Sequence, residues 1–133
     1  MEKTVLISSV AYCGLICKLC HLADECDGCQ ATANKCSAHA EREKGCYHRS
    51  CCIRKGLRGC WECSEFPCEQ HMFSGPTRGE LIGFCRYIKS DGLARFIDAI
   101  LANDRKGIPY GKISYGDKTD MEVIAMLQMS FLV

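Results

Sequence analysis

Cysteines at short, repeated gaps are the residues of this chain that could do chemistry. The stretch AYCGLICKLCHLADECDGC, residues 11–29, contains five of them, and twelve of the thirteen cysteines fall between Cys13 and Cys68. A Cys-x2-Cys gap lets two sulfurs reach one tetrahedral ion from a single tight turn, and two such pairs normally complete a four-ligand site. The chain has this gap three times. The spacing therefore predicts metal held by thiolates.

Eleven cysteines of this zone are the predicted ligands. Order along the chain does not fix which of them share an ion. One simple scheme joins the first three with a partner from Cys26 or Cys29, and another joins the last three with Cys51. Cys36 and Cys46 then supply the remaining positions. The predicted ligands are Cys13, Cys17, Cys20, Cys26, Cys29, Cys36, Cys46, Cys51, Cys60, Cys63 and Cys68.

Zinc, as two or three ions in each chain, is the predicted metal. Disulfides are disfavoured because the cysteine count is odd and the N-terminal segment MEKTVLISSVAYC lacks a convincing export cleavage site. These features predict a reducing, cytoplasmic setting, in which clustered cysteines typically bind metal. An iron–sulfur cluster is the alternative, since thiolates bind either metal, but the cysteine spacings do not match those of ferredoxins.

Other residues with ligand chemistry are given simpler interpretations. Cys85 lies apart from the zone, on the apolar face of a predicted helix, and is expected to be a buried core thiol. The four histidines could each replace a sulfur, but an exposed side chain is the simpler interpretation of each. They are His21, His39, His48 and His71.

A basic segment runs through the same zone. A zinc ion bound by four thiolates carries a formal double negative charge, and nearby cations and N–H donors stabilise its sulfurs. We therefore expect the segment to compensate thiolate charge. Nucleic-acid binding is not expected, because the net charge of the chain is only +1. The basic residues are Arg42, Lys44, Arg49, Arg54, Lys55 and Arg58.

The elements that must position the cysteines are irregular. Residues 13–68 show little hydrophobic periodicity, which predicts loops, knuckles and short helical turns that depend on metal for stability. Residues 4–12, TVLISSVAY, are β-branched and apolar and predict one short strand. The expected fold is a small irregular metal-stapled cysteine-rich module over residues 1–74. A mainly α-helical region, residues 75–133, follows and packs on it as one compact domain.

The helical region begins with a regular pattern. Thr77 and Glu80 form a predicted capping box, and a helix follows that ends near Gly92. A second helix continues to Gly107 and Pro109. The apolar faces of these helices are Leu81, Phe84, Cys85 and Ile88 in the first and Leu93, Phe96, Ile97, Ile100 and Leu101 in the second.

The end of the chain contains a second capping signal. Residues 108–120 form a turn-rich connector, with a small hairpin as one option. Thr119 and Glu122 form the second predicted capping box. The following segment, MEVIAMLQMSFLV, is apolar on nearly every face, so we expect it to pack within the domain, with a homodimer contact as the second option.

Composition excludes some classes of protein. Apolar residues make up 47% and charged residues 25% of the 133 residues, as in soluble globular proteins. No apolar run reaches the roughly 18–20 residues of a membrane span. No Ser/His/Asp, paired-carboxylate or phosphate-loop signature is present, so the sequence favours a protein that is not an enzyme.

The cysteine zone resembles a prokaryotic family called domain of unknown function 3795. The resemblance covers residues 12–70 and rests on YCGL at 12–15, CDGC at 26–29 and CWECSEFPC at 60–68. It implies a cysteine-rich, metal-binding domain. Cys52 falls outside the shared pattern and is therefore not counted among the ligands.

The sequence thus predicts a metal-binding protein in which clustered cysteines hold structural zinc and form an interaction module for another protein. Two alternatives remain open. One is an iron–sulfur protein for redox chemistry or electron transfer, and the other is a metal-dependent enzyme with an open metal position.

Overall fold

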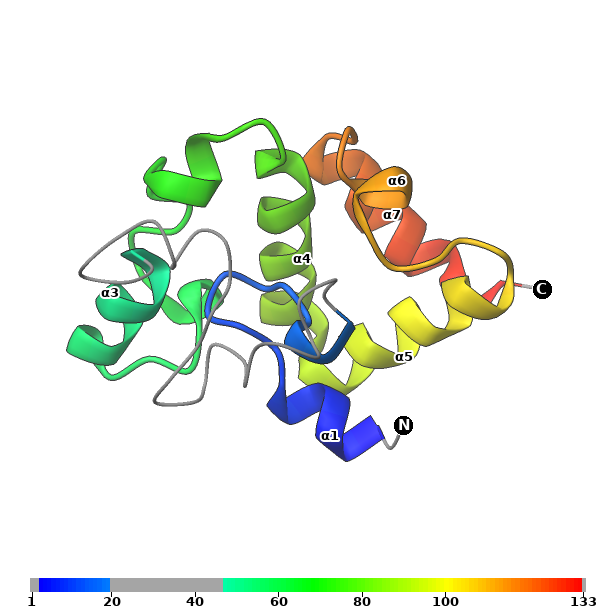
Figure 1. Cartoon of the computed structure of the whole chain (residues 1–133), viewed down its shortest axis with the longest axis horizontal. Helices are drawn as coiled ribbons and strands as arrows, with labels where there is room; N and C mark the ends of the chain where they lie inside the picture. Colours follow the sequence, from blue (N-terminus) through cyan, green and yellow to red (C-terminus); the bar gives the residue numbers. More distant parts are fainter. Residues whose placement is uncertain (1–2, 20–46, 133) are drawn as a thin grey trace. The chain divides into compact units, whose positions relative to one another are not determined.

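The computed structural model of the chain describes residues 3–19 and 47–132 (Figure 1). The chain divides into two compact units, Met1–Phe66 and Pro67–Val133. The described residues form helices, with no strand among them. The mainly helical character expected for the C-terminal region is therefore confirmed. The packing of the two parts into one compact domain stays a prediction.

The first unit begins with a helix where a strand was expected. Helix α1 spans Lys3–Ser8. At its C-terminal end, the Ser8 hydroxyl donates a hydrogen bond to the Val5 carbonyl at 3.0 Å. The strand prediction for residues 4–12 is wrong, because a short apolar run fits a helix as well as a strand. In the part of the chain that the structure describes, extended pairing is limited to one antiparallel bridge, between Val10 and Ile16.

Three further helical elements carry cysteines in the described part of the first unit. The short 3-10 helix η1 spans Cys17–Leu19. Helix α3 spans Tyr47–Lys55, and the 3-10 helix η2 spans Cys60–Glu62. Helix α3 is longer than the short turns expected for this zone. It buries His48 and Cys52 but leaves Ile53 53% exposed, so its inward face consists of ligand-type side chains and not of an apolar stripe.

Arg58 connects the two described segments of the first unit. Its guanidinium donates to the backbone carbonyls of Val10 at 2.9 Å and Ile7 at 3.2 Å, and it lies over the ring of Trp61, 5.7 Å from the centroid. The Cys60 N–H donates to the Tyr12 carbonyl at 2.8 Å. These contacts hold the end of α1 and the loop after it against η2.

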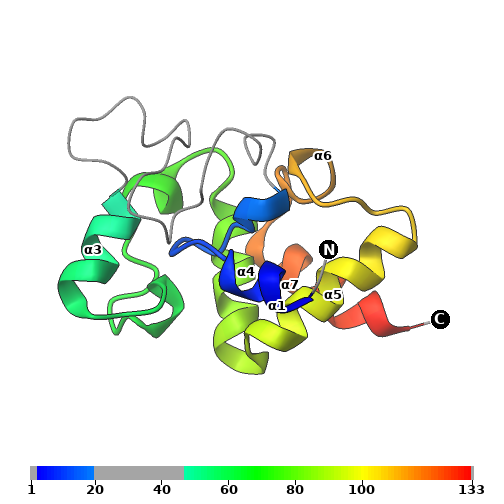
Figure 2. The same cartoon turned by 60° about the horizontal axis from the view of Figure 1, so that its bottom comes forward.

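The second unit is helical throughout its described elements, and Figure 2 shows them from a second direction. Helix α7 packs most extensively on α4, and α5 contacts both of these helices. The elements are η3 (His71–Ser74), α4 (Arg78–Asp91), α5 (Leu93–Arg105), α6 (Lys112–Tyr115), α7 (Asp120–Gln128) and η4 (Met129–Phe131).

The apolar faces expected for α4 and α5 form the core of this unit. All four predicted positions of α4 are buried, including the thiol of Cys85. In α5, Phe96, Ile97 and Ile100 are buried, whereas Leu93 and Leu101 are partly exposed. Gly92 separates the two helices at φ 92°, a left-handed value that glycine adopts without strain. The helical periodicity of the sequence therefore predicted this core correctly.

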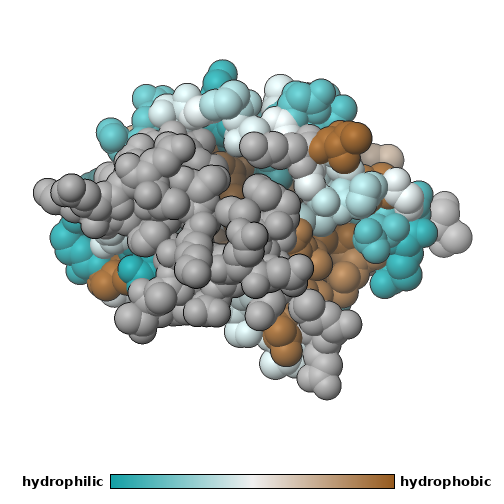
Figure 3. Space-filling view, viewed as in Figure 1, coloured by the Kyte–Doolittle hydropathy of each residue, from teal (hydrophilic) through white to brown (hydrophobic). Residues whose placement is uncertain are grey.

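Helices α4 and α7 approach closely at a glycine. A Cβ placed on Gly83 would lie 2.8 Å from the Cβ of Val123, which is itself buried. The connector before α7 contains the short helix α6, so the hairpin considered there is not formed. Met121 and Met129 remain exposed, and apolar atoms, brown in Figure 3, reach the surface of the α5–α7 region. The homodimer contact stays a prediction that sedimentation analysis can test.

The two predicted capping boxes have different outcomes. At Thr119, the hydroxyl accepts from the Glu122 N–H at 3.1 Å and the Glu122 carboxylate accepts from the Thr119 N–H at 3.0 Å. The box predicted at Thr77 and Glu80 is wrong, since the Thr77 side chain makes no capping hydrogen bond. The cause is the backbone, because Thr119 is extended at φ −76°, ψ 163° whereas Thr77 is at φ −105°, ψ 21°.

This difference provides a matched pair of variants. Thr119→Ala is expected to lower the free energy of unfolding by about 0.5–2 kcal/mol, because it leaves an N–H at the helix start without its acceptor. Thr77→Ala is expected to change it by less than about 0.5 kcal/mol. Chemical denaturation followed by circular dichroism measures both, and equal losses would contradict the assignment of the cap.

The capping box at Thr119 also predicts a pH effect. The Thr119 N–H lowers the pKa of the Glu122 carboxyl from its ordinary value. A carboxyl whose pKa is lower in the folded state stabilises the fold at pH values above its pKa in the unfolded chain, about 4.3. That stabilisation is lost as the pH falls below this value. Denaturation curves of the wild type and Glu122→Gln should therefore converge at acidic pH. A difference that grows on acidification would oppose this.

Candidate functional site

The structure describes six of the eleven predicted ligands. Cys13 is buried in the loop after α1, and Cys17 begins η1. Cys51 lies on α3, Cys60 begins η2, and Cys63 follows η2. Cys68 falls at the start of the second unit. The other five lie outside the described residues, and these are Cys20, Cys26, Cys29, Cys36 and Cys46.

An inner thiol group joins α3 to η2. The sulfurs of Cys52 and Cys60 are 3.6 Å apart, and the Cys60 sulfur is 3.5 Å from Nδ1 of His48. The three side chains are buried, at 1% exposure for His48, 2% for Cys52 and 7% for Cys60. His48 and Cys52 are four residues apart on one helix and therefore share a face. Two segments of the chain thus bring a buried imidazole and two buried thiols together.

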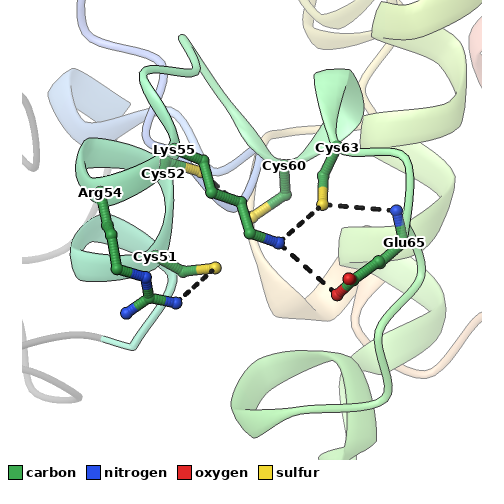
Figure 4. A network of polar contacts seen from close by, with 7 residues as sticks. All are labelled: Cys51, Cys52, Arg54, Lys55, Cys60, Cys63 and Glu65. Carbon is green, nitrogen blue, oxygen red and sulfur yellow. Dashed lines mark hydrogen bonds and ion pairs between the residues drawn. The ribbon is translucent and has the colours of Figure 1, made fainter.

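An outer thiol group, consisting of Cys51 and Cys63, lies beside the inner one. Figure 4 shows these two side chains and that of Cys60 turned toward the Lys55 ammonium. Lys55 Nζ donates to the Cys63 sulfur at 3.4 Å and pairs with a Glu65 carboxylate oxygen at 3.5 Å. The Glu65 N–H also donates to the Cys63 sulfur, at 3.4 Å. Arg54 donates to the Cys51 sulfur at 3.7 Å. Both outer sulfurs therefore accept from positively charged groups.

The surroundings of Cys52 favour the ionised form of its thiol. The contact with Cys60 lowers the pKa of the Cys52 thiol, and the charge of Lys55 acts in the same direction against the effect of burial. The Cys63 sulfur raises the pKa of the Lys55 ammonium, with smaller contributions from Cys51 and Glu65. Thiolate is the form that binds metal, so the electrostatics suit a metal-binding role.

Arg58 differs from the other two basic side chains. It is half-buried, burial lowers the pKa of its guanidinium, and its hydrogen bonds go to backbone carbonyls. Its place over Trp61 makes it part of the packing of the first unit. Arg54 and Lys55 contact sulfur, whereas Arg58 supports the backbone.

Within residues 3–19 and 47–132, no three His, Cys, Asp or Glu side chains form a group that could hold a metal ion by themselves. The grouping of Cys60, Cys63 and Cys68 with Cys51 is not assembled there as a complete site. Which cysteines share an ion therefore stays a prediction.

Two residues of the inner group were missed by the sequence analysis. Cys52 was left out of the predicted ligands, and His48 was interpreted as exposed, which its burial shows to be wrong. The signal that identifies them is the spacing His48-x3-Cys52, which is a ligand-type pair only on a helix. Because residues 13–68 were expected to lack long helices, this spacing did not indicate that His48 and Cys52 share a face.

Comparison with known proteins gives a family match for part of the chain. Residues 22–73 match the model of the family described as protein of unknown function (DUF3795). The DUF3795 segment includes α3 and η2, and with them His48, Cys52 and Cys60, whereas the motif YCGL at 12–15 precedes the match. Comparisons with curated proteins and with solved structures gave no match. No described helix is long and apolar enough to cross a membrane.

Proposed function

We propose that this chain is a metal-binding protein whose clustered cysteines hold structural zinc and form an interaction module for another protein. The observation that carries the proposal is the 3.6 Å contact between the buried sulfurs of Cys52 and Cys60. Two thiolates on one tetrahedral zinc ion, with Zn–S bonds of about 2.3 Å, lie about 3.8 Å apart. The separation of the two sulfurs agrees with neighbouring ligands of one ion.

The same contact does not suit a disulfide. A disulfide bond is about 2.05 Å long, much shorter than the observed 3.6 Å separation. Both sulfurs are buried, whereas redox-active thiols normally need access to a reaction partner. Metal binding therefore accounts better for the pair.

The composition of the buried face of α3 supports a structural role for the metal. This helix buries His48 and Cys52 and exposes Ile53, so apolar packing contributes little to its position. Thiols and imidazole stabilise a fold strongly when they share a metal ion, which is why many small metal domains unfold without it. The contacts of Arg54 and Lys55 with sulfur further support charge compensation of thiolates.

Elemental analysis of freshly purified protein, prepared without oxygen, tests the choice of metal. Zinc in a colourless sample supports the proposal. Iron with inorganic sulfide in a brown sample would favour the alternative of an iron–sulfur protein. A zinc ion that exchanges a bound water for an added anion would instead favour a metal-dependent enzyme with an open position.

Metal removal should affect the two units differently. A chelator with reductant is expected to abolish tertiary order around α3 and η2, because that region has few buried apolar side chains. Helices α4, α5 and α7 have an apolar core and should keep their structure. Amide spectra of the chain before and after chelation measure this, and unchanged signals from residues 47–66 would contradict the proposed coupling.

We propose that the basic segment compensates the negative charge of the thiolates and does not bind nucleic acid. The support for this proposal is that Arg54 and Lys55 contact sulfurs and Arg58 contacts backbone carbonyls. We expect no measurable binding of RNA or DNA at physiological salt. A salt-sensitive complex that Lys55→Ala weakens, with the log–log salt slope reduced by about one unit, would reverse this ranking.

A further inference from the structure

The outer side of helix α7 is apolar along most of its length. Met121 is 71% exposed, Met129 is 59% exposed, and Ala125, midway between them, is exposed as well. Intervals of four residues place these three side chains along one face of the helix, opposite the buried Val123 and Leu127. Met121, Ala125 and Met129 therefore form an exposed apolar stripe, the α7 stripe, on the side away from the core.

Apolar surface continues beyond the end of α7. Leu132 is 61% exposed and Phe131 is 37% exposed. Together with the α7 stripe, these side chains form an apolar patch on the order of a few hundred Å², and patches of this size on soluble proteins often serve an interface. The expected partner is therefore a surface that is itself apolar.

The charges beside the α7 stripe differ between its two ends. At the start, the Glu122 carboxylate is exposed and accepts from the Thr119 N–H of the capping box. At the end, the Lys106 ammonium donates to the carbonyls of Met129, at 3.2 Å, and of Leu132. These hydrogen-bond partners are backbone groups without net charge, so they do not cancel the charges of Glu122 and Lys106.

Neighbouring charges keep this difference. At the start of the stripe, the Asp120 carboxylate pairs with Arg86 at 3.4 Å, within the second unit. At the end, the Arg95 guanidinium lies over the ring of Phe131, 3.6 Å from the centroid, and adds a second positive charge. The stripe is therefore negative at its start and positive at its end.

An antiparallel pair of α7 helices fits this pattern of charge. Glu122 and Met129 are seven residues apart, nearly two helical turns, so Glu122 and the Lys106 that contacts Met129 lie at the same edge of the stripe. A twofold axis near Ala125 then brings Glu122 of each copy opposite the partner's Lys106. We propose that the α7 stripe is the interface of a homodimer in which two α7 helices pack antiparallel across Ala125.

A parallel pair of the same helices is disfavoured. It would place each Glu122 near the partner's Glu122 and each Lys106 near the partner's Lys106, and like charges across an interface repel. The antiparallel pair instead makes each opposite-charge contact twice. This self-complementarity favours a second copy of the chain over an unrelated protein as the occupant of the stripe.

The size of the patch sets the expected affinity. Stable complexes bury about 800 Å² on each partner, which is more than the patch supplies. The dimer is therefore expected to form at micromolar concentrations and to dissociate on dilution. The contact lies within the second unit and needs no metal, so the inference goes beyond the proposed function.

Sedimentation of the full chain over a range of concentrations tests the interface. Ala125→Glu is an exposed change to a good helix former, and it places two negative charges beside the twofold axis. It is expected to weaken the dimer by at least about 10-fold. Ile53→Ser, which removes an apolar side chain that is 53% exposed in the first unit, should dimerise as the wild type does.

Exchange of the two charges tests the antiparallel arrangement. Lys106→Glu and Glu122→Lys are each expected to weaken the homodimer by about 5–10-fold, because each change places like charges in both edge contacts. An equal mixture of the two variants should recover the wild-type affinity, since every edge contact then joins opposite charges again. Circular dichroism of each variant checks that its helices are kept.

A measurement on the unaltered protein covers the case in which Glu122→Lys, which lacks the capping carboxylate, does not fold. In a mixture of isotope-labelled and unlabelled chains, the Met121 methyl group should show a nuclear Overhauser contact with the partner's Met129. Contacts between equivalent methionines would indicate a parallel pair and overturn the inference. A wild type that stays monomeric at millimolar concentration, or an Ala125→Glu variant that dimerises as strongly as the wild type, would also overturn it. None of these results affects the proposed function, which depends on metal content.

Discussion

Cys60→Ser is expected to lose at least one metal ion per chain and the tertiary order of the described part of the first unit. The Cys60 sulfur takes part in both inner contacts, and a serine hydroxyl does not ionise to replace the thiolate. Structural zinc contributes an apparent free energy of about 10–16 kcal/mol in small zinc domains, so its loss exceeds the stability of most domains. Elemental analysis and amide spectra measure the two effects.

Cys85→Ser is the matched control for this variant. It makes the same chemical change at a thiol that is fully buried in the second unit and lies outside the cysteine zone. Burying a hydroxyl there should destabilise α4 and its neighbours, yet the metal content should stay that of the wild type. Equal metal contents in Cys60→Ser and the wild type would show that Cys60 does not bind the metal.

Phe84→Ala is the variant expected to affect the second unit most. The ring of Phe84 is fully buried and lies 5.1 Å from the ring centroid of Phe96 and 5.3 Å from that of Tyr115. Removing a buried phenyl ring leaves a cavity and costs about 3–5 kcal/mol of unfolding free energy. Denaturation monitored at α4, α5 and α7 should show this loss with the metal content unchanged.

An exposed apolar residue provides the comparison. Ile113 is 89% exposed, so Ile113→Ala should change the unfolding free energy by less than about 0.5 kcal/mol. Similar losses in both variants would mean that the aromatic contacts of Phe84 do not form the core of this unit. Metal loss in Phe84→Ala would show that the two units depend on each other.

The helices of the second unit could be predicted because their signals are local. Phe84 and Ile88 repeat at helical spacing, and Gly92 stops the helix by adopting a left-handed conformation. The capping prediction succeeded at Thr119 and failed at Thr77, although both positions have the same residue pattern. Side-chain identity alone does not fix the backbone angles that a cap needs, and only Thr119 has them.

The sequence identified the residue type that forms the candidate site, but not which of these residues lie together, and metal binding by their thiolates stays a prediction. Repeated Cys-x2-Cys gaps identify thiolate chemistry, because the spacing itself limits where two sulfurs can reach. The contact of Cys52 with Cys60 depends on the position of α3 relative to η2, which no gap length encodes. The expected strand over residues 4–12 failed for a related reason, since a short apolar run is compatible with either backbone conformation.

Mass spectrometry of the intact chain under non-denaturing conditions tests the central claim most directly. Protein purified without chelator should carry two or three zinc ions per chain, and acid denaturation should release them all. A fully folded chain that carries no metal in the same measurement would contradict the account.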